Sequence, residues 1–176
     1  MFENFPKDFF WGASTSSHQV EGGNDNDWTR FEEKNAQRLA DNASKTSFFL
    51  DENARQARRV DNYISGKACD HYNLFESDIY LANKLDLNAY RFSIEWSRIE
   101  PQKGLFDKEA IAHYKKMVRV LRAYKMEPIV TIWHWTMPKW FADQGGFSKR
   151  KNIKYFLRFV KKIALQLNGD VKYFIT

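Results

Sequence analysis

Residues 127–140 read Glu-Pro-Ile-Val-Thr-Ile-Trp-His-Trp-Thr-Met-Pro-Lys-Trp, and this stretch decides the fold. Ile129 to Trp133 is a run of β-branched and aromatic residues after a helical pattern and a proline, as in a buried parallel strand. The pair His134 and Trp135 follows where the strand must end and a loop must begin. Because ligands bind at the carboxyl ends of parallel strands, we expect a binding site at this pair.

Two amphipathic helices are predicted before this strand. The first spans Asp70–Leu85, where apolar residues recur at helical spacing at Phe75, Ile79 and Ala82. The second begins after Asp107, a suitable N-cap, and ends near Lys125. Its apolar stripe consists of Ile111, Tyr114, Val118 and Leu121.

Three further strands are predicted, at Phe9–Ala13, Asn88–Trp96 and Val171–Thr176. The first ends in a polar segment that includes His18 and Gln19. Asp25–Phe31 is expected to be a polar loop whose Trp28 either caps the core or lines the site. Glu33–Lys67 has few apolar residues and is expected to be a long surface loop with a possible helix over 52–63.

The strand at Asn88–Trp96 alternates in polarity. Tyr90, Phe92 and Ile94 share one face, whereas Arg91, Ser93 and Glu95 share the other. In an antiparallel edge strand the polar face would meet water, but in a barrel strand it must point inward. A buried arginine then needs an anionic partner. Glu95 lies roughly 13 Å along the same strand, so we expect the carboxylate to come from elsewhere.

Alternating strands and helices of this kind predict an α/β fold with a parallel sheet. A closed (β/α)8 barrel needs about 250 residues, so residues 1–176 would supply about four β/α units, the N-terminal half of one barrel domain. No helix follows the last strand. We therefore expect the sequence to be a fragment of a longer protein.

Composition fits an ordinary globular domain, with 43% hydrophobic and 28% charged residues. Cys69 is the single cysteine and can form no internal disulfide, which favours a reducing compartment. The first residues lack the pattern of a signal peptide, and no apolar run is long enough to span a membrane. These observations predict a cytoplasmic protein without membrane contact.

The net charge of +6 raises the possibility of nucleic-acid binding. Much of the excess lies between Lys149 and Lys162, in a helix that Ser148 is expected to cap and Asn168-Gly169 to end. Basic residues at helical spacing oppose an apolar stripe of Ile153, Phe156, Leu157, Val160 and Ile163. No base-reading motif accompanies them, so we interpret this face as solvated and predict no nucleic-acid partner. The basic residues are Lys151, Lys154, Arg158, Lys161 and Lys162.

Most known catalytic motifs are absent from the sequence, including Gly-rich phosphate loops, His-Glu-x-x-His, paired cysteines and Gly-x-Ser-x-Gly. The four histidines are scattered, so no metal and no cofactor are predicted. Gln19, Arg91, His134 and Trp135 remain near predicted strand exits. Taken singly, His134 and Trp135 are more often core residues and Gln19 is uninformative, but together the four form a site of amide, imidazole and indole groups. Such a site suits a neutral polyhydroxylated ligand.

Several long motifs make the sequence resemble the N-terminal part of glycoside hydrolase family 1, which contains β-glucosidases and β-galactosidases. The resemblance covers nearly the whole chain, from about Phe9 to Thr176. It rests on four segments, namely Phe-Phe-Trp-Gly-Ala-Ser-Thr-Ser-Ser-His-Gln-Val-Glu-Gly at 9–22, Asp-His-Tyr at 70–72, Tyr-Arg-Phe-Ser-Ile-Glu-Trp-Ser-Arg-Ile at 90–99 and His-Trp at 134–135.

The resemblance implies a (β/α)8 barrel that hydrolyses β-linked saccharides or aryl and alkyl β-glycosides with retention and without a cofactor. It implies that Gln19 and His134 bind sugar hydroxyls, with Trp135 beside them, and that Arg91 lies under the nucleophilic glutamate. The family's acid/base glutamate follows the fourth strand in Asn-Glu-Pro, and its nucleophile lies on the seventh strand. Neither is identifiable here, so this chain alone contains no catalytic residue and is expected to be inactive.

Two alternatives stay open. Thr136-Met137 stands where many family members have Asp-Leu, which leaves open whether the substrate is a glucoside, a galactoside or a 6-phosphorylated glycoside. The other alternative is a non-catalytic sugar-binding half-barrel that dimerises to close its sheet.

Overall fold

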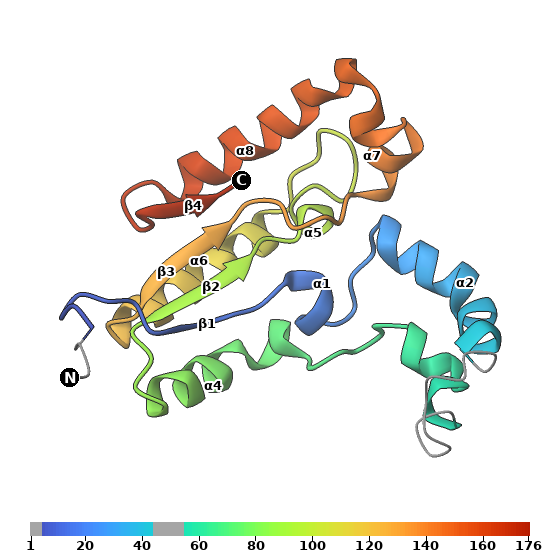
Figure 1. Ribbon diagram of the computed structural model, residues 1–176. Coiled ribbons are helices and arrows are strands. Elements are labelled where there is room, and N and C mark those ends of the chain that lie inside the picture. Colours follow the sequence, from blue (N-terminus) through green and yellow to red (C-terminus); the bar gives the residue numbers. More distant parts are fainter. Residues whose placement is uncertain (1–4, 44–54) are drawn as a thin grey trace.

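The computed structural model describes residues 5–43 and 55–176. Four strands alternate with helices along the chain (Figure 1). The elements are β1 (Gly12–Ser14), α1 (Ser17–Val20), α2 (Asp27–Ala43), η1 (Val60–Tyr63), α4 (His71–Lys84), β2 (Ala89–Ser93), α5 (Trp96–Ile99), α6 (Lys108–Ala123), β3 (Glu127–Thr131), α7 (Lys139–Asp143), η2 (Gly146–Ser148), η3 (Arg150–Asn152), α8 (Ile153–Leu167) and β4 (Tyr173–Ile175).

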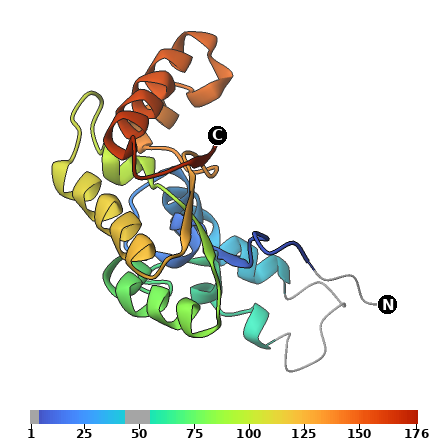
Figure 2. The same ribbon diagram turned by 90° about the vertical axis from the view of Figure 1, so that its left-hand side faces the viewer.

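The four strands form one parallel sheet in the order β1-β2-β3-β4, which confirms the predicted α/β class. Figure 2 shows α4, α6 and α8 in an arc along one side of the curved sheet. In Figure 1 the strand arrows point toward the end of the sheet where α1, α5 and α7 lie. The residues that follow each strand are therefore gathered at this end.

The hydrophobic core lies between the sheet and these three helices. Tyr90 and Phe92 of β2 and Val130 of β3 face the helices and are almost fully buried. The stripes predicted for the two central helices are confirmed, because Phe75, Ile79 and Ala82 of α4 and Ile111, Tyr114, Val118 and Leu121 of α6 are all buried. Burial of each large apolar side chain stabilises the fold by about 1.5–3 kcal/mol.

The N-terminus of α6 is capped as predicted. The Asp107 carboxylate accepts hydrogen bonds from the backbone N–H groups of Glu109 at 2.7 Å and Ala110 at 3.1 Å. The expected cap of α8 is wrong, because Ser148 lies in η2 and the N-cap position belongs to Asn152. Asn152 is buried, and its amide donates to the carbonyls of Gln144 and Gly146. These two bonds hold the short turns that precede the helix.

Two predicted segments near the N-terminus differ in the structure. The first strand begins at Gly12 rather than Phe9, while Phe9 and Trp11 form an exposed aromatic cluster with Phe5. The loop predicted at Asp25–Phe31 is wrong, because α2 begins at Asp27 and contains Trp28. Its start is fixed by Asn26, whose side-chain oxygen accepts from the Thr29 backbone N–H at 2.8 Å, as in an N-cap.

The long loop expected over Glu33–Lys67 is also partly helical. Helix α2 continues to Ala43 because Ala36 and Ala40 bury its inner face. Residues 44–54 lie outside the described residues, and with them the start of the helix expected over 52–63. Within the described remainder of that helix, Val60–Tyr63 form the 3-10 turn η1.

Helix α8 is turned relative to the predicted stripe. Phe159, Ile163 and Leu167 are buried, whereas Ile153 and Leu157 are exposed. Arg158 does not belong to a solvated face, because it forms an ion pair with the fully buried Glu100. A buried carboxylate must be paired, so Glu100 draws this side of the helix inward. No helix among the described residues is long and apolar enough to span a bilayer.

Candidate functional site

A cavity of about 250 Å³ lies at the carboxyl ends of β1 and β3. Three of the four predicted site residues, Gln19, His134 and Trp135, line it together. The fourth, Arg91, does not. The remaining lining residues are Ser16, His18, Trp28 and Thr136.

Each wall of the cavity is a short turn that follows a strand. After β1 the chain enters α1, which carries Gln19. After β3 the Thr136 N–H donates to the His134 carbonyl at 3.0 Å, which closes a tight turn around Trp135. Trp135 adopts φ 75° and is 74% exposed. A left-handed backbone is uncommon for a bulky side chain, and such strain is typical of ligand sites.

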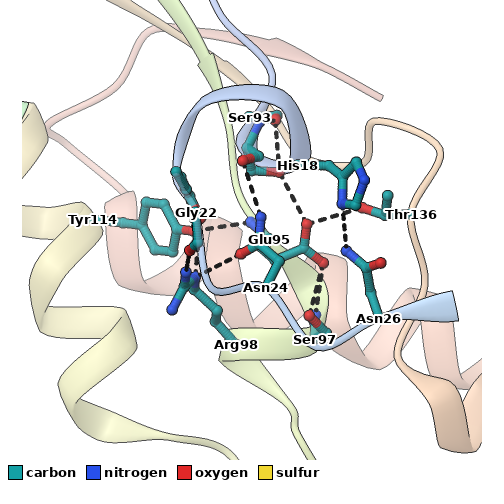
Figure 3. A network of polar contacts seen from close by, with 12 residues as sticks. His18, Gly22, Asn24, Asn26, Ser93, Glu95, Ser97, Arg98, Tyr114 and Thr136 are labelled. Atoms are coloured by element: carbon teal, nitrogen blue, oxygen red, sulfur yellow. Dashed lines mark hydrogen bonds and ion pairs between the residues drawn. The ribbon is translucent and has the colours of Figure 1, made fainter. Parts of the chain in front are cut away.

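A buried carboxylate joins the two walls (Figure 3). Glu95 has no exposed surface. Its Oε2 accepts hydrogen bonds from Ser17 Oγ at 3.1 Å and Thr136 Oγ1 at 2.9 Å. Its Oε1 accepts from the N–H and the hydroxyl of Ser97, at 3.3 and 2.9 Å. The sequence pattern placed Glu95 on the inward face but gave no sign of these partners.

Glu21 is a second buried acid close to this network. It accepts a 2.7 Å hydrogen bond from the Tyr114 phenol and a 3.0 Å bond from Arg98 Nε. Tyr114 in turn accepts from the backbone N–H of Glu95. Burial, and next the nearby Glu95, raise the pKa of Glu21 to about 7, although Arg98 and Tyr114 oppose this shift.

Trp28 lies at the cavity because hydrogen bonds hold the start of α2 beside the turn that follows β3. The backbone N–H of Asp27 donates to the Met137 carbonyl at 2.9 Å, and the Met137 N–H donates to the Asp27 carboxylate at 2.7 Å. His18 is held between the Asn26 amide and the Glu32 carboxylate, at 3.1 and 2.9 Å. These contacts hold the start of α2 against the cavity. Trp28 therefore lines the cavity and does not cap the core.

Arg91 lies on the face of β2 opposite the core, where its guanidinium donates to Thr131 Oγ1 at 3.4 Å. None of the ion pairs within residues 5–43 and 55–176 includes Arg91. Glu95 is engaged by serine and threonine hydroxyls instead. A carboxylate partner for Arg91 therefore stays a prediction.

The cavity is lined by polar and aromatic side chains of the kinds that bind ligands. Its lining contains an amide, two imidazoles, two indoles and two hydroxyls, and no lining residue carries a carboxylate. Of the two imidazoles, that of His18 already bonds Asn26 and Glu32. Paired donors and acceptors beside flat apolar rings suit a neutral polyhydroxylated ligand. In the part of the chain that the structure describes, no group of three or more His, Cys, Asp or Glu residues could hold a metal ion.

Comparison with known proteins gives one consistent family. Residues 1–176 match the model for Glycosyl hydrolase family 1. The chain is 31% identical over 168 residues to β-glucosidase A of Acetivibrio thermocellus, with 95% of this chain and 34% of that protein aligned. It is 30% identical over 176 residues to the aryl-phospho-β-D-glucosidase BglC of Bacillus subtilis, with 99% and 34% aligned.

Among solved structures, a β-glycosidase from Pyrococcus horikoshii is similar, with a TM-score of 0.79 and 36% identity. The match covers 97% of this chain and 34% of that one. The chain thus spans about a third of the length of each of these proteins.

Proposed function

The chain belongs to glycosyl hydrolase family 1, and from that membership we propose that it forms the first four β/α units of a single barrel domain in a retaining β-glycosidase. Its substrates are β-linked saccharides or aryl and alkyl β-glycosides, and no cofactor takes part. The observation that carries this proposal is that Gln19, His134 and Trp135 line one cavity at the carboxyl ends of parallel strands.

In this proposal the sugar ring occupies the cavity. Gln19 and His134 form hydrogen bonds with its hydroxyls, and the exposed indole of Trp135 supports an apolar face of the ring. Trp28, which is 49% exposed on the same cavity, supplies a further flat surface. These residues orient the glycosidic bond. Correct orientation of the bound substrate lowers the free-energy barrier to bond cleavage.

Bond cleavage itself needs groups that the cavity lacks. Retention requires two carboxyl groups about 5 Å apart, one a nucleophile and the other an acid that then acts as a base. We propose that both come from beyond residues 1–176. Arg91 lies beneath the nucleophile and favours its ionised form. The 176-residue chain alone is therefore expected to be inactive.

The names of the relatives give several candidate substrates and do not select one sugar. One relative is named a β-glucosidase and another an aryl-phospho-β-D-glucosidase, at nearly equal identity. The assay therefore includes a neutral glucoside, a neutral galactoside and a 6-phosphorylated glycoside. A cytoplasmic location is proposed on the single cysteine, Cys69, which is free and exposed.

The test is to obtain the complete protein that contains this chain and assay it on aryl β-glucoside, β-galactoside and 6-phospho-β-glucoside. We expect cleavage with retention, and a loss of about tenfold or more in kcat/KM for Gln19→Ala and for His134→Ala. Gln37→Ala is the matched control, because Gln37 is exposed on α2 and bonds Asp41. Sugar binding without cleavage would instead favour the sugar-binding half-barrel.

A further inference from the structure

We propose that Glu95 is a positioning residue, whose buried carboxylate sets the separation of the two cavity walls. This inference rests on the proposed function, because the walls carry the residues assigned to sugar binding. Glu95 does not line the cavity itself. It therefore acts through the turns that it holds, and not by touching the substrate.

The first step of the argument is the identity of the atom that joins the walls. Ser17 and Thr136 donate to the same oxygen of Glu95, Oε2, from positions 78 and 41 residues away in the sequence. Gln19 lies two residues after Ser17 in the same helical turn. Trp135 directly precedes Thr136. One oxygen thus bonds both turns, and we infer that its position contributes to the distance between Gln19 and Trp135.

The second step is that this oxygen is itself fixed. Oε1 is held by the backbone N–H and the hydroxyl of Ser97, and the Glu95 N–H donates to Tyr114. Figure 3 shows this arrangement, with Ser97 and Thr136 beside the Glu95 carboxylate. Because Glu95 has no exposed surface, its carboxylate is satisfied by these protein groups and not by bulk water. A buried, fully bonded network of this kind is rigid.

The third step concerns the strained turn. Trp135 has φ 75°, a conformation that persists only when surrounding contacts over-determine it. The Thr136 hydroxyl bond to Glu95 is one such contact, and the 3.0 Å bond from Trp133 Nε1 to the Thr136 carbonyl is another. Without Glu95 the first contact is lost, and the turn can relax to a backbone conformation that places Trp135 differently.

Two serines provide a matched pair of variants. Ser17 and Ser97 are 4% and 5% exposed, and each donates its hydroxyl to Glu95. Ser17→Ala removes the hydroxyl bond between Glu95 and the wall that carries Gln19. Ser97→Ala keeps the Glu95 bonds to both walls and the backbone N–H bond of residue 97 to Oε1. In the complete enzyme we expect Ser17→Ala to lower kcat/KM on the preferred β-glycoside about tenfold, equivalent to about 1.4 kcal/mol, and Ser97→Ala to change it much less.

A second readout separates positioning from a general loss of stability. For each variant, kcat/KM is compared between the β-glycoside and its singly deoxygenated analogues. If Gln19 is misplaced, it no longer bonds one sugar hydroxyl. The ratio of kcat/KM for the β-glycoside to kcat/KM for the analogue that lacks this hydroxyl then falls toward one in Ser17→Ala but not in Ser97→Ala. Equal losses in the two variants, with unchanged ratios, would overturn the inference.

A third measurement does not depend on catalysis. Hydrogen exchange is followed in the same protein for peptides covering 14–22 and 132–138, in Glu95→Ala and in the control Glu100→Ala. Both glutamates are fully buried, but Glu100 bonds Trp96, Gly104 and Arg158 instead of the walls. Faster exchange in both peptides for Glu95→Ala alone supports the inference even if no glycoside is cleaved. Unchanged exchange in both peptides contradicts it.

Discussion

Arg91 Nη1 donates a 3.4 Å hydrogen bond to Thr131 Oγ1 across the neighbouring strands β2 and β3, on the sheet face opposite the core. A guanidinium has five N–H donors, so this one long bond leaves donors for a carboxylate. The sheet thus presents a half-buried cation, and its pairing with the proposed nucleophile stays a prediction.

We predict that Arg91→Met in the complete enzyme lowers kcat by about 10² or more. Loss of the cation disfavours the ionised nucleophile, so the acidic limb of the pH profile of kcat/KM moves to higher pH. Arg91→Lys keeps the charge but loses the fork of N–H donors, so its kcat should lie between those of the wild type and Arg91→Met. An acidic limb that stays in place in Arg91→Met would show that Arg91 has no carboxylate partner.

The buried Glu21 should make stability fall with rising pH. Its pKa is raised from 4.5 to about 7, mainly by burial, so between these values the folded state binds more protons than the unfolded state. This contribution is fully present below pH 4.5 and is lost as pH rises through about 7, by about 3 kcal/mol at most. Denaturant unfolding from pH 4.5 to 8 should show this decline in the wild type and a flatter curve in Glu21→Gln.

His113 should act in the opposite direction. Burial, and then the charges of Arg98, His71 and Lys116, lower its pKa from 6.5 to about 4, so the folded state binds fewer protons between these values. Stability from this group is therefore present above pH 6.5 and is lost as pH falls toward 4. His113→Phe keeps a ring to stack on Tyr72, which lies 3.7 Å away between centroids.

The same unfolding series tests this sign. His113→Phe should be less sensitive to acid than the wild type between pH 6.5 and 4.5, whereas Glu21→Gln should be more sensitive, because it removes the opposing contribution. A parallel response of the two variants would contradict the assigned directions.

The sequence was sufficient wherever a local pattern decided the structure. Helices α4 and α6 follow from apolar residues at helical spacing, and the cap at Asp107 follows from its residue type and place. Gln19, His134 and Trp135 could be grouped because parallel strands end at one edge of a sheet, so residues after different strands meet there. The function assigned to them came from the resemblance, and their binding of sugar stays a prediction.

One missed signal was local, and contacts between distant residues decided the other differences. The Asn26 cap was a local signal that the polar composition around it concealed, so the start of α2 was missed. The rotation of α8 depends on Glu100, 58 positions from Arg158, and the role of Glu95 depends on partners 78 and 41 positions away. Single-sequence periodicity contains no information about such pairs.

Two capping positions provide a last prediction, which concerns stability alone. Asp107 accepts from two backbone N–H groups at the start of α6, whereas Ser148 makes no side-chain cap contact to α8. Asp107→Ala leaves those N–H groups without a protein partner and should lower the free energy of unfolding by about 1 kcal/mol. Ser148→Ala should change it by less than about 0.5 kcal/mol. Urea unfolding at pH 7 measures both values under the same conditions. A larger loss in Ser148→Ala than in Asp107→Ala would contradict the assignment of Ser148 as a residue without a capping role.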